Sequence, residues 1–95
     1  MIKFAAIKAT PVETVDTRIV HAYDHTTCYT YYAEAYGWYL QAQPDKYEVE
    51  EGFLLDDGTF VDRTTALTIA RKCKQLKSMY DYTDVLYSYM IDWTR

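Results

Sequence analysis

The sequence predicts a small α+β domain in which two β-hairpins are each followed by a helix. Two observations lead to this class: pairs of short apolar segments are separated by turn residues, and a helical pattern with a polar capping residue follows each pair. A length of 95 residues fits one domain. The expected element order over residues 1–95 is therefore β-β-α-β-β-α-α.

The first hairpin is expected near the N-terminus. Ile2–Ala9 alternates imperfectly between apolar and polar side chains, which is typical of a strand, and Thr10-Pro11 ends it because proline lacks an N–H donor. Thr17–Tyr23 alternates again and predicts a second strand. Pro11–Asp16 is then a rather long loop between two antiparallel strands.

A first helix is expected after Asp24 or Thr26, since either side chain can cap it. Apolar side chains recur at offsets of three, four, seven and eight residues, which predicts one buried stripe. That stripe consists of Cys28, Tyr31, Tyr32, Ala35 and Tyr36. Gly37 offers a C-terminal exit, although Trp38–Leu40 can add a turn, and Gln41–Asp45 is expected to be a loop.

Residues 51–76 predict one hairpin that runs straight into a helix. The apolar runs Phe53–Leu55 and Thr59–Val61 are separated by Asp56-Asp57-Gly58, and Gly58 tolerates a positive φ. Asp62 precedes the helical pattern and is expected to cap it. The predicted apolar face of this helix is Ala66, Leu67, Ile69, Ala70 and Cys73. The acidic segment Tyr47–Glu51 leads into the hairpin.

The C-terminal part predicts a short last helix. Ser78–Tyr82 has no clear period, whereas Thr83 can cap a helix over Asp84–Trp93. Its apolar residues, among them Leu86 and Met90, would dock on the body of the domain or on a neighbouring chain.

Composition excludes several classes of protein. A net charge of −4 argues against a protein that binds long nucleic acids, because such proteins carry a clear basic excess. No segment approaches the roughly 18–20 apolar residues that cross a bilayer, and no signal-peptide pattern is visible. Cys28 and Cys73 are too few for a disulfide framework, so we expect reduced thiols in a cytoplasmic protein.

Tyrosine is the one outlier in composition, with 11 residues in the chain. Each buried phenol needs a polar partner, so this number exceeds what a core of this size requires. Two interpretations remain open: a tyrosine-rich surface that binds a ligand or another copy of the chain, and a tyrosine-lined core with hydrated edges.

Residues His21, Asp24, His25 and Cys28 have spacings that are compatible with zinc ligation, but no paired cysteines support a metal site. We therefore expect no metal and no cofactor. No carboxylate pair or nucleophile with its base is recognisable, so we do not expect an enzyme. Asp24–Thr27 lies where a strand meets a helix N-terminus; it either binds an anion or, with Asp24 or Thr26, merely caps the helix.

A second junction of strand and helix occurs at Asp62-Arg63. Arg63 offers a planar fork of donors to a phosphate, or it pairs with a neighbouring acid. Phe53 and Phe60 flank this junction in the hairpin and would either stack on a base or lie in the core.

These residues also carry a resemblance to a family of small tailed-phage proteins with the motif "(Q/E)GF(L/V)…G.FV(D/N)R..A..IA…Q". The matching residues are Glu51-Gly52-Phe53-Leu54, Gly58–Arg63, Ala66, Ile69-Ala70 and Gln75, with weaker likeness at Ile2–Ile7, Arg18, His21, His25 and Leu86-Tyr87-Ser88. The chain departs from the pattern in its extra tyrosines and at Cys73-Lys74, where a small Ala-Gly is usual.

The motif family is similar to the first-described Thoeris anti-defence proteins. Those phage proteins act as homo-oligomers that sequester cyclic-ADP-ribose-type immune signals, and some also hold cyclic oligonucleotides. The resemblance implies that Phe53, Asp62 and Arg63 contact the ligand through stacking and through phosphate or ribose contacts. Arg18 and His25 are further candidates from the N-terminal half.

The leading hypothesis is a phage-encoded, homo-oligomeric binding protein in the cytoplasm of the infected bacterial host. It would hold a small nucleotide-derived signal without catalysis, with Phe53 and Phe60 as stacking candidates. The alternative is a protein-interaction module that inhibits a host protein through a tyrosine-rich surface and the acidic residues Glu48–Glu51. A third and weaker hypothesis is an enzyme that acts on a nucleotide through His21 and His25.

Overall fold

The computed structural model describes residues 1–12, 16–36 and 47–93. Its elements are β1 (Ile2–Pro11), β2 (Arg18–Ala22), α1 (His25–Tyr36), β3 (Tyr47–Leu55), β4 (Phe60–Asp62) and α2 (Arg63–Lys72), followed by two 3₁₀ turns at Ser78–Tyr80 and Ser88–Met90. The predictions for Gly37, Trp38–Leu40 and Gln41–Asp45 lie outside the described residues.

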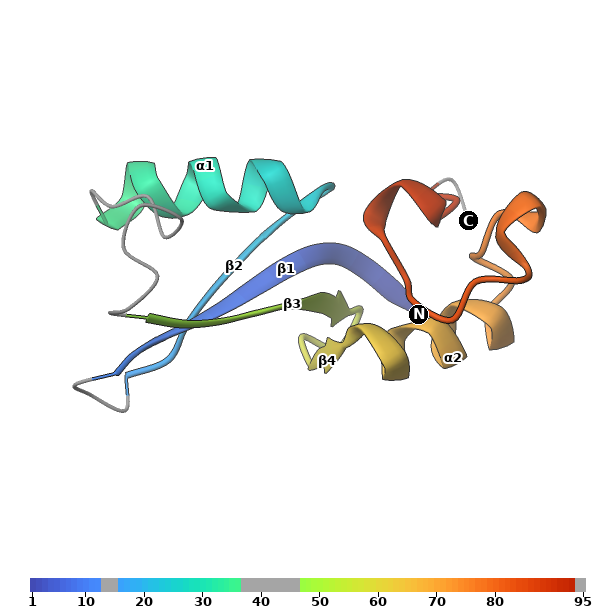
Figure 1. Ribbon diagram of the computed structural model, residues 1–95, viewed down its shortest axis with the longest axis horizontal. Helices are drawn as coiled ribbons and strands as arrows, with labels where there is room; N and C mark the ends of the chain where they lie inside the picture. The colour runs from blue at the N-terminus through green and yellow to red at the C-terminus, as the bar shows by residue number, and fades with distance from the viewer. Residues whose placement is uncertain (13–15, 37–46, 94–95) are drawn as a thin grey trace.

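The four strands form one antiparallel sheet in the order β2-β1-β3-β4 (Figure 1). Both predicted hairpins and the α+β class are therefore confirmed. Strand β3 is longer than Phe53–Leu55 because it includes the acidic segment. There Glu50 lies opposite Lys8 of β1 and Glu48 lies opposite Thr10, so one of the acidic residues faces a residue of opposite charge in the neighbouring strand.

Helix α1 lies along β1 and β2 (Figure 1). The Asp24 carboxylate accepts a hydrogen bond from the Thr27 N–H at 2.6 Å, which confirms Asp24 as its cap. The buried stripe is narrower than predicted and consists of His25, Cys28 and Tyr32. Tyr31, Ala35 and Tyr36 are exposed, because only one line of side chains at offsets of three and four residues meets the sheet.

The C-terminal segment corrects one prediction, because no helix forms over Asp84–Trp93. Leu76 and Ile91 form an antiparallel bridge, the Lys77 N–H donates to the Met90 carbonyl, and the Asp92 N–H donates to the Gln75 carbonyl. Backbone groups that pair across two segments cannot also form a helical ladder. Within Asp84–Trp93, the residues Ser88–Met90 make a single 3₁₀ turn.

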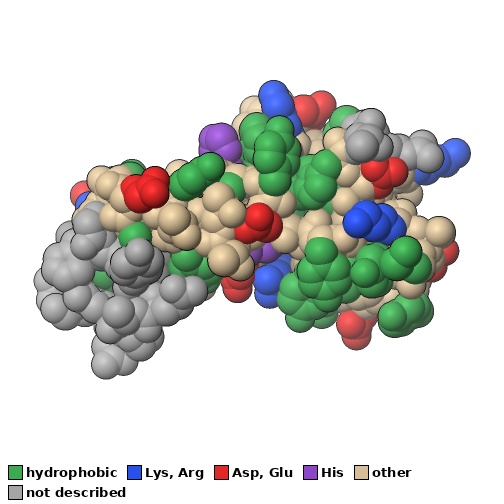
Figure 2. Space-filling model, turned by 90° about the horizontal axis from the view of Figure 1, so that it is seen from above, with side chains coloured by type: hydrophobic (Ala, Val, Ile, Leu, Met, Phe, Trp, Pro, Cys, Tyr) green, Lys and Arg blue, Asp and Glu red, His purple; other side chains and the backbone are tan. Residues whose placement is uncertain are grey.

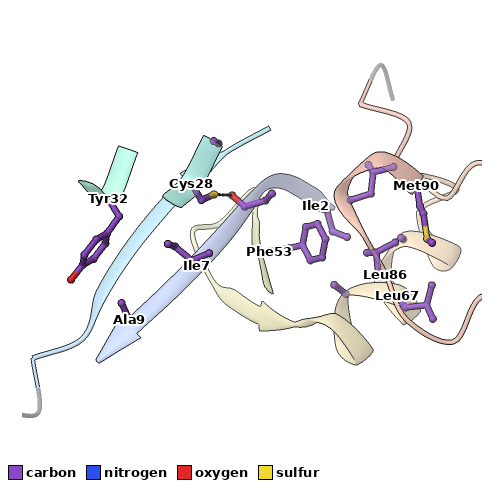
Figure 3. Close-up of a cluster of buried hydrophobic side chains, with 14 residues drawn as sticks. Ile2, Ile7, Ala9, Cys28, Tyr32, Phe53, Leu67, Leu86 and Met90 are labelled. Atoms are coloured by element: carbon purple, nitrogen blue, oxygen red, sulfur yellow. Dashed lines mark hydrogen bonds between the residues drawn. The ribbon is translucent and has the colours of Figure 1, made fainter. Parts of the chain in front are cut away.

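Leu86 and Met90 nevertheless dock on the body, where they join the core beside α2 (Figure 3). One cluster of buried side chains runs from Cys28 and Tyr32 of α1 through Ile7 and Phe53 of the sheet to these residues.

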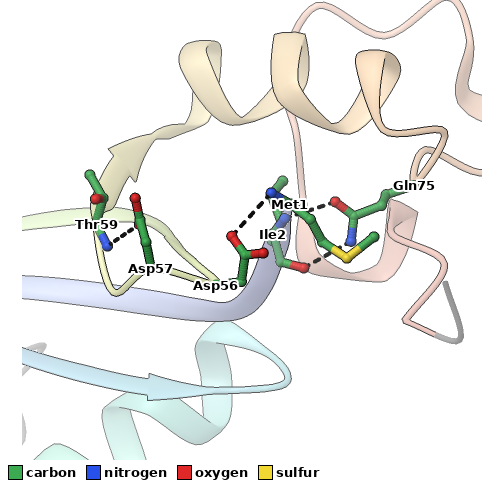
Figure 4. Close-up of polar contacts among 6 residues, drawn as sticks. All are labelled: Met1, Ile2, Asp56, Asp57, Thr59 and Gln75. Atoms are coloured by element: carbon green, nitrogen blue, oxygen red, sulfur yellow. Dashed lines mark hydrogen bonds and ion pairs between the residues drawn. The ribbon is translucent and has the colours of Figure 1, made fainter.

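Gln75 ties α2 to the start of the chain (Figure 4). Its side chain is only 1% exposed, its Oε1 accepts from the Ile2 N–H at 2.8 Å, and its Nε2 donates to the Ile2 carbonyl at 2.8 Å. Strand β2 ends at Ala22, opposite Ala5, so it does not reach this part of β1. The amide of Gln75 therefore takes the place of a neighbouring strand at Ile2.

The end of α2 lies at one of the positions where the chain departs from the phage motif it resembles. Lys74 has φ of +57°, the left-handed conformation, and the Gln75 N–H reaches back to the Ala70 carbonyl at 2.8 Å. This is the geometry of a Schellman cap, in which glycine is the preferred residue at the left-handed position. The glycine of the usual Ala-Gly pattern would stand at this position without strain.

Candidate functional site

The junction between β4 and α2 is organised by Asp62. Its Oδ1 accepts a hydrogen bond from the Thr65 N–H at 2.7 Å, which confirms the predicted cap of α2. The same hydrogen bond lowers the pKa of the Asp62 carboxyl below its usual value. The carboxylate remains exposed, so a second role in contacting a ligand stays a prediction.

Arg63 follows Asp62 and lies between an acid and an aromatic ring. Its Nη2 is 3.4 Å from Glu51 Oε1, and its guanidinium carbon is 4.7 Å from the centre of the Tyr87 ring. The Arg63 side chain is 26% exposed, while its Nε is buried and has no hydrogen-bond partner among the described residues. The predicted pairing with an acid is present, together with a cation–π contact that the sequence did not reveal.

His25 lies beside this arginine and is held by β3. Its Nε2 donates to the Gly52 carbonyl at 2.8 Å, and its ring meets the edge of Phe53 at 5.1 Å. Burial lowers the pKa of His25; the positive charge of Arg63 adds to this effect, while the Gly52 hydrogen bond and the charge of Glu51 oppose it. His25 is therefore a neutral, oriented ring at neutral pH.

Tyr29 belongs to the same electrostatic neighbourhood. Its pKa is raised first by burial and then by Glu51, and Arg63 opposes the shift. We name the group of Arg63, Glu51, Tyr87, His25 and Tyr29 the Arg63 cluster. It joins α1, β3, the start of α2 and the C-terminal segment.

The two phenylalanines predicted to stack on a ligand lie on opposite faces of the sheet. Phe53 is 0% exposed and belongs to the core. Phe60 is half-buried on the other face, where Lys8 Nζ lies 5.5 Å from its ring centre. Phe53 pairs with Val61, the neighbour of Phe60, and successive side chains of a strand point to opposite faces. The two rings therefore do not form one stacking platform.

Gly52 explains why Phe60 can lie where it does. A Cβ atom at Gly52 would be 2.2 Å from the Val61 carbonyl oxygen and 2.6 Å from the Phe60 ring. The glycine of the motif is thus required by the close approach of β4 and by the Phe60 ring that covers it.

Arg18 lies apart from the Arg63 cluster. Arg18 is the first residue of β2 and lies opposite Ala9 of β1. Its Nη1 donates to the Tyr32 hydroxyl at 3.1 Å, and its guanidinium carbon is 4.4 Å from the Tyr36 ring centre. Of the six predicted site residues, the structure thus brings His25, Asp62 and Arg63 to one junction with Phe53 buried beneath them. It places Arg18 and Phe60 elsewhere.

The two histidines also lie apart. His21 packs against Phe4 at 4.4 Å between ring centres, whereas His25 packs against Phe53. Phe4 is the chain neighbour of Ala5, which lies opposite Phe53, so the two phenylalanines point to opposite faces. The structure therefore does not bring His21 and His25 together as a pair.

The C-terminal segment carries a row of tyrosines beside Arg63. The Tyr87 and Tyr89 rings are parallel within 4° at 5.7 Å between centres, and Tyr80 meets Tyr89 edge-on at 5.7 Å. Tyr87 is 39% and Tyr89 59% exposed. We name these three residues the tyrosine row. Figure 2 shows that hydrophobic side chains, tyrosines included, form groups on the surface with single charged side chains between them.

Tyrosine is divided between surface and core. Tyr32 is fully buried, whereas six tyrosines are more than a third exposed, namely Tyr23, Tyr31, Tyr36, Tyr82, Tyr87 and Tyr89. Most of the tyrosines that the structure places are thus at least a third exposed, and their binding of a ligand or another copy of the chain stays a prediction.

Within the described ranges, no group of three or more His, Cys, Asp or Glu side chains is placed to hold a metal ion. Cys28 and Cys73 are both free thiols, and Cys28 is buried with its Sγ 3.5 Å from the Ala5 carbonyl oxygen. No helix in the part of the chain that the structure describes is long and apolar enough to cross a membrane.

The chain was compared with protein families, curated proteins and solved structures. The family described as phage T4 y16D protein matches residues 1–91. No curated protein and no solved structure matches the chain. Because the match covers nearly the whole sequence, the chain belongs to the phage T4 y16D protein family.

Proposed function

We propose that this phage protein binds and sequesters a small nucleotide-derived immune signal at the Arg63 cluster, without catalysis. The observation that carries the proposal is Arg63 itself. Its side chain is 26% exposed beside the exposed rings of Tyr87 and Tyr89, and its buried Nε has no acceptor among the described residues.

A phosphate would bind Arg63 more strongly than Glu51 does. Charge-assisted hydrogen bonds between guanidinium and oxyanion are usually about 2.7–2.9 Å long, whereas the contact with Glu51 measures 3.4 Å. A phosphate accepts two parallel N–H bonds from the planar fork, and this geometry gives both strength and orientation. Glu51 would then turn away, since its charge repels the ligand.

The base of the ligand would stack on the tyrosine row rather than on Phe53. Tyr87 lies against Arg63, and Tyr89 continues the row with more than half of its surface exposed. Stacking of a base on an aromatic side chain is worth about 1–3 kcal/mol in other nucleotide-binding proteins. A phosphate on Arg63 and a base on a tyrosine would thus be held by neighbouring groups.

The ligand class follows from the resemblance of the 51–76 motif to Thoeris anti-defence proteins, and membership in a phage family agrees with a phage origin. We propose cyclic ADP-ribose isomers or cyclic oligonucleotides as ligands and a homo-oligomer in the host cytoplasm as the working form.

Calorimetric titration of the purified protein with cyclic ADP-ribose isomers and with cyclic di- and trinucleotides tests the proposal. Arg63→Gln should weaken binding at least about tenfold, because a charge-assisted contact is lost. Glu51→Gln should tighten it, because a competing carboxylate is removed. Lys72→Gln, at the exposed far end of α2, is the matched control for the loss of a positive charge. No binding of any of these ligands at high micromolar concentration would refute the proposal.

A second candidate function is inhibition of a host protein. It is favoured by the exposed Met79 and Tyr82, which are 68% and 84% exposed and lie in the same C-terminal segment as the tyrosine row. Affinity capture from host lysate, with wild-type and a Tyr82→Ser, Tyr89→Ser double variant in parallel, tests it. One stoichiometric host partner that is lost with the double variant supports this function, and equal capture by both proteins contradicts it.

A further inference from the structure

A hollow lies at the end of β2, where the chain turns into α1. Its volume is about 330 Å³, and four rings line it: Phe4 of β1, His21 of β2, Tyr23 after β2 and Tyr31 of α1. Asp24 and Thr27 complete its polar part. We name this hollow the aromatic pocket. It contains none of the Arg63 cluster.

The rings of the aromatic pocket meet at angles instead of lying in one plane. Phe4 is 4.4 Å from His21 at 31° and 5.5 Å from Tyr23 at 51°. On its other side, Tyr23 is supported by the edge contact with Trp93 at 5.7 Å. Tyr23 is 65% and Tyr31 48% exposed, so aromatic surface in the pocket is open to a ligand.

The charge in the pocket is negative. Hydrogen bonds from Thr27 lower the pKa of the Asp24 carboxyl, so Asp24 is ionised at neutral pH. Its Oδ1 is fixed by the Thr27 N–H at the start of α1, which holds the carboxylate in place at the pocket. Among residues 1–12, 16–36 and 47–93, no lysine or arginine lines the hollow.

One ring of the pocket, Phe4, already has a cation of the chain near it. The ammonium group of Lys3 lies 5.7 Å from the centre of the Phe4 ring, within the range of a cation–π contact. Lys3 is exposed and is not among the residues that line the pocket. Its ammonium group therefore contacts Phe4 but does not neutralise Asp24 or cover the other rings.

We infer that the aromatic pocket binds an alkylammonium group, supplied either by a free amine or by a lysine side chain of a partner protein. Several aromatic rings with a carboxylate are the combination that recognises such groups, since the ring faces and the carboxylate both attract positive charge. A nucleotide phosphate is a poor occupant, because Asp24 repels it and no cationic side chain of the described residues lines the pocket. The aromatic pocket and the Arg63 cluster share no residue, so the inference about one site can be refuted while the proposal about the other stands.

Amide NMR titration of the full chain tests the inference with three probes: choline, the neutral isostere of choline in which carbon replaces nitrogen, and N-acetyl-lysine methylamide. We expect choline or the lysine derivative to shift the amide signals of Tyr23, Asp24 and Thr27. Either cation should bind about threefold or more tightly than the neutral isostere, as expected for a cation–π site. Tighter binding of choline assigns the site to free amines, and tighter binding of the lysine derivative assigns it to a protein side chain.

Variants separate charge from folding. Asp24→Asn keeps a residue that caps helices well but removes the negative charge, and it should weaken cation binding about two- to fivefold. Tyr23→Ala should weaken it further, whereas Tyr82→Ala, an exposed tyrosine outside the pocket, should not change it. Lys3→Gln should tighten binding, since it removes a competing cation. Equal binding of choline and its neutral isostere, or unchanged binding by Asp24→Asn, overturns the inference.

Discussion

Replacement of Gln75 by leucine should be among the most destabilising single changes in this chain. Leucine has a similar size but can neither accept from the Ile2 N–H nor donate to the Ile2 carbonyl, both of which Gln75 now binds at 2.8 Å. The site is buried, and β2 does not extend to Ile2, so neither backbone group gains a new strand partner. Two buried backbone groups are therefore left without their partners.

The expected loss follows from these two groups. A buried donor or acceptor without a partner costs about 1–3 kcal/mol, so the pair costs about 2–6 kcal/mol, reduced by the small gain from burying an apolar side chain. Domains of this size have free energies of unfolding of roughly 5–15 kcal/mol. Urea unfolding followed by circular dichroism should thus show a midpoint far below that of the wild type.

Thr68→Ala provides the matched control, because Thr68 is an exposed residue of α2 whose hydroxyl makes only a local contact with the Thr64 carbonyl at 3.5 Å. Its midpoint should stay close to that of the wild type. A change below about 1 kcal/mol for Gln75→Leu, with an unaltered slope of unfolding against urea, would show that water or a shifted segment satisfies Ile2 and would refute the reasoning.

Three further predictions concern the backbone and the buried histidine. Gly52→Ala should lower the free energy of unfolding by about 1–3 kcal/mol or more, because its Cβ would lie 2.2 Å from a backbone oxygen; urea unfolding measures this, and a neutral effect contradicts the close approach of β4. Lys74→Gly should raise stability by roughly 0.5–1 kcal/mol, since φ of +57° strains lysine but not glycine; a lower midpoint than that of the wild type contradicts it. The pKa of His25 is lowered by burial, so its contribution to stability is complete above the unfolded value of about 6.5 and is lost as the pH falls toward the folded pKa. His25→Gln should therefore lose less stability between neutral pH and mildly acidic pH than the wild type, and equal losses in both proteins would exclude this role.

The parts of the fold that could be predicted are those governed by local rules. Gly58 has the positive φ, +87°, that its turn requires, and Asp62 caps α2 through the Thr65 N–H. Each of these features depends on residues within three positions of one another, so the sequence contains the whole cause. The hairpin and helix of residues 51–76 were predictable for this reason.

The parts that could not be predicted depend on contacts between distant residues. Thr83 before an apolar pattern favoured a helix, but Leu76 and Ile91 pair instead, and the Asp92 N–H is bound by the Gln75 carbonyl. Such backbone pairing outweighs a weak local helix preference. For the candidate site, Arg63 could be found from its place after the cap. Tyr87 could not, because only the folding of the C-terminal segment brings it to the guanidinium.

The motif of residues 51–76 divides into residues that the fold requires and one that it does not fully explain. Gly52 admits β4, Phe53 and Ala70 fill the core, Asp62 caps α2, and Gln75 completes the hydrogen bonds of β1. Arg63 differs, because its contact with Glu51 is long, its side chain is partly exposed, and its Nε has no partner among the described residues. A long, partly exposed ion pair of this kind contributes little to stability, about 0–1 kcal/mol. A substitution at Arg63 should therefore leave the fold intact, which makes it the position in the motif where loss of ligand binding can be separated from loss of structure.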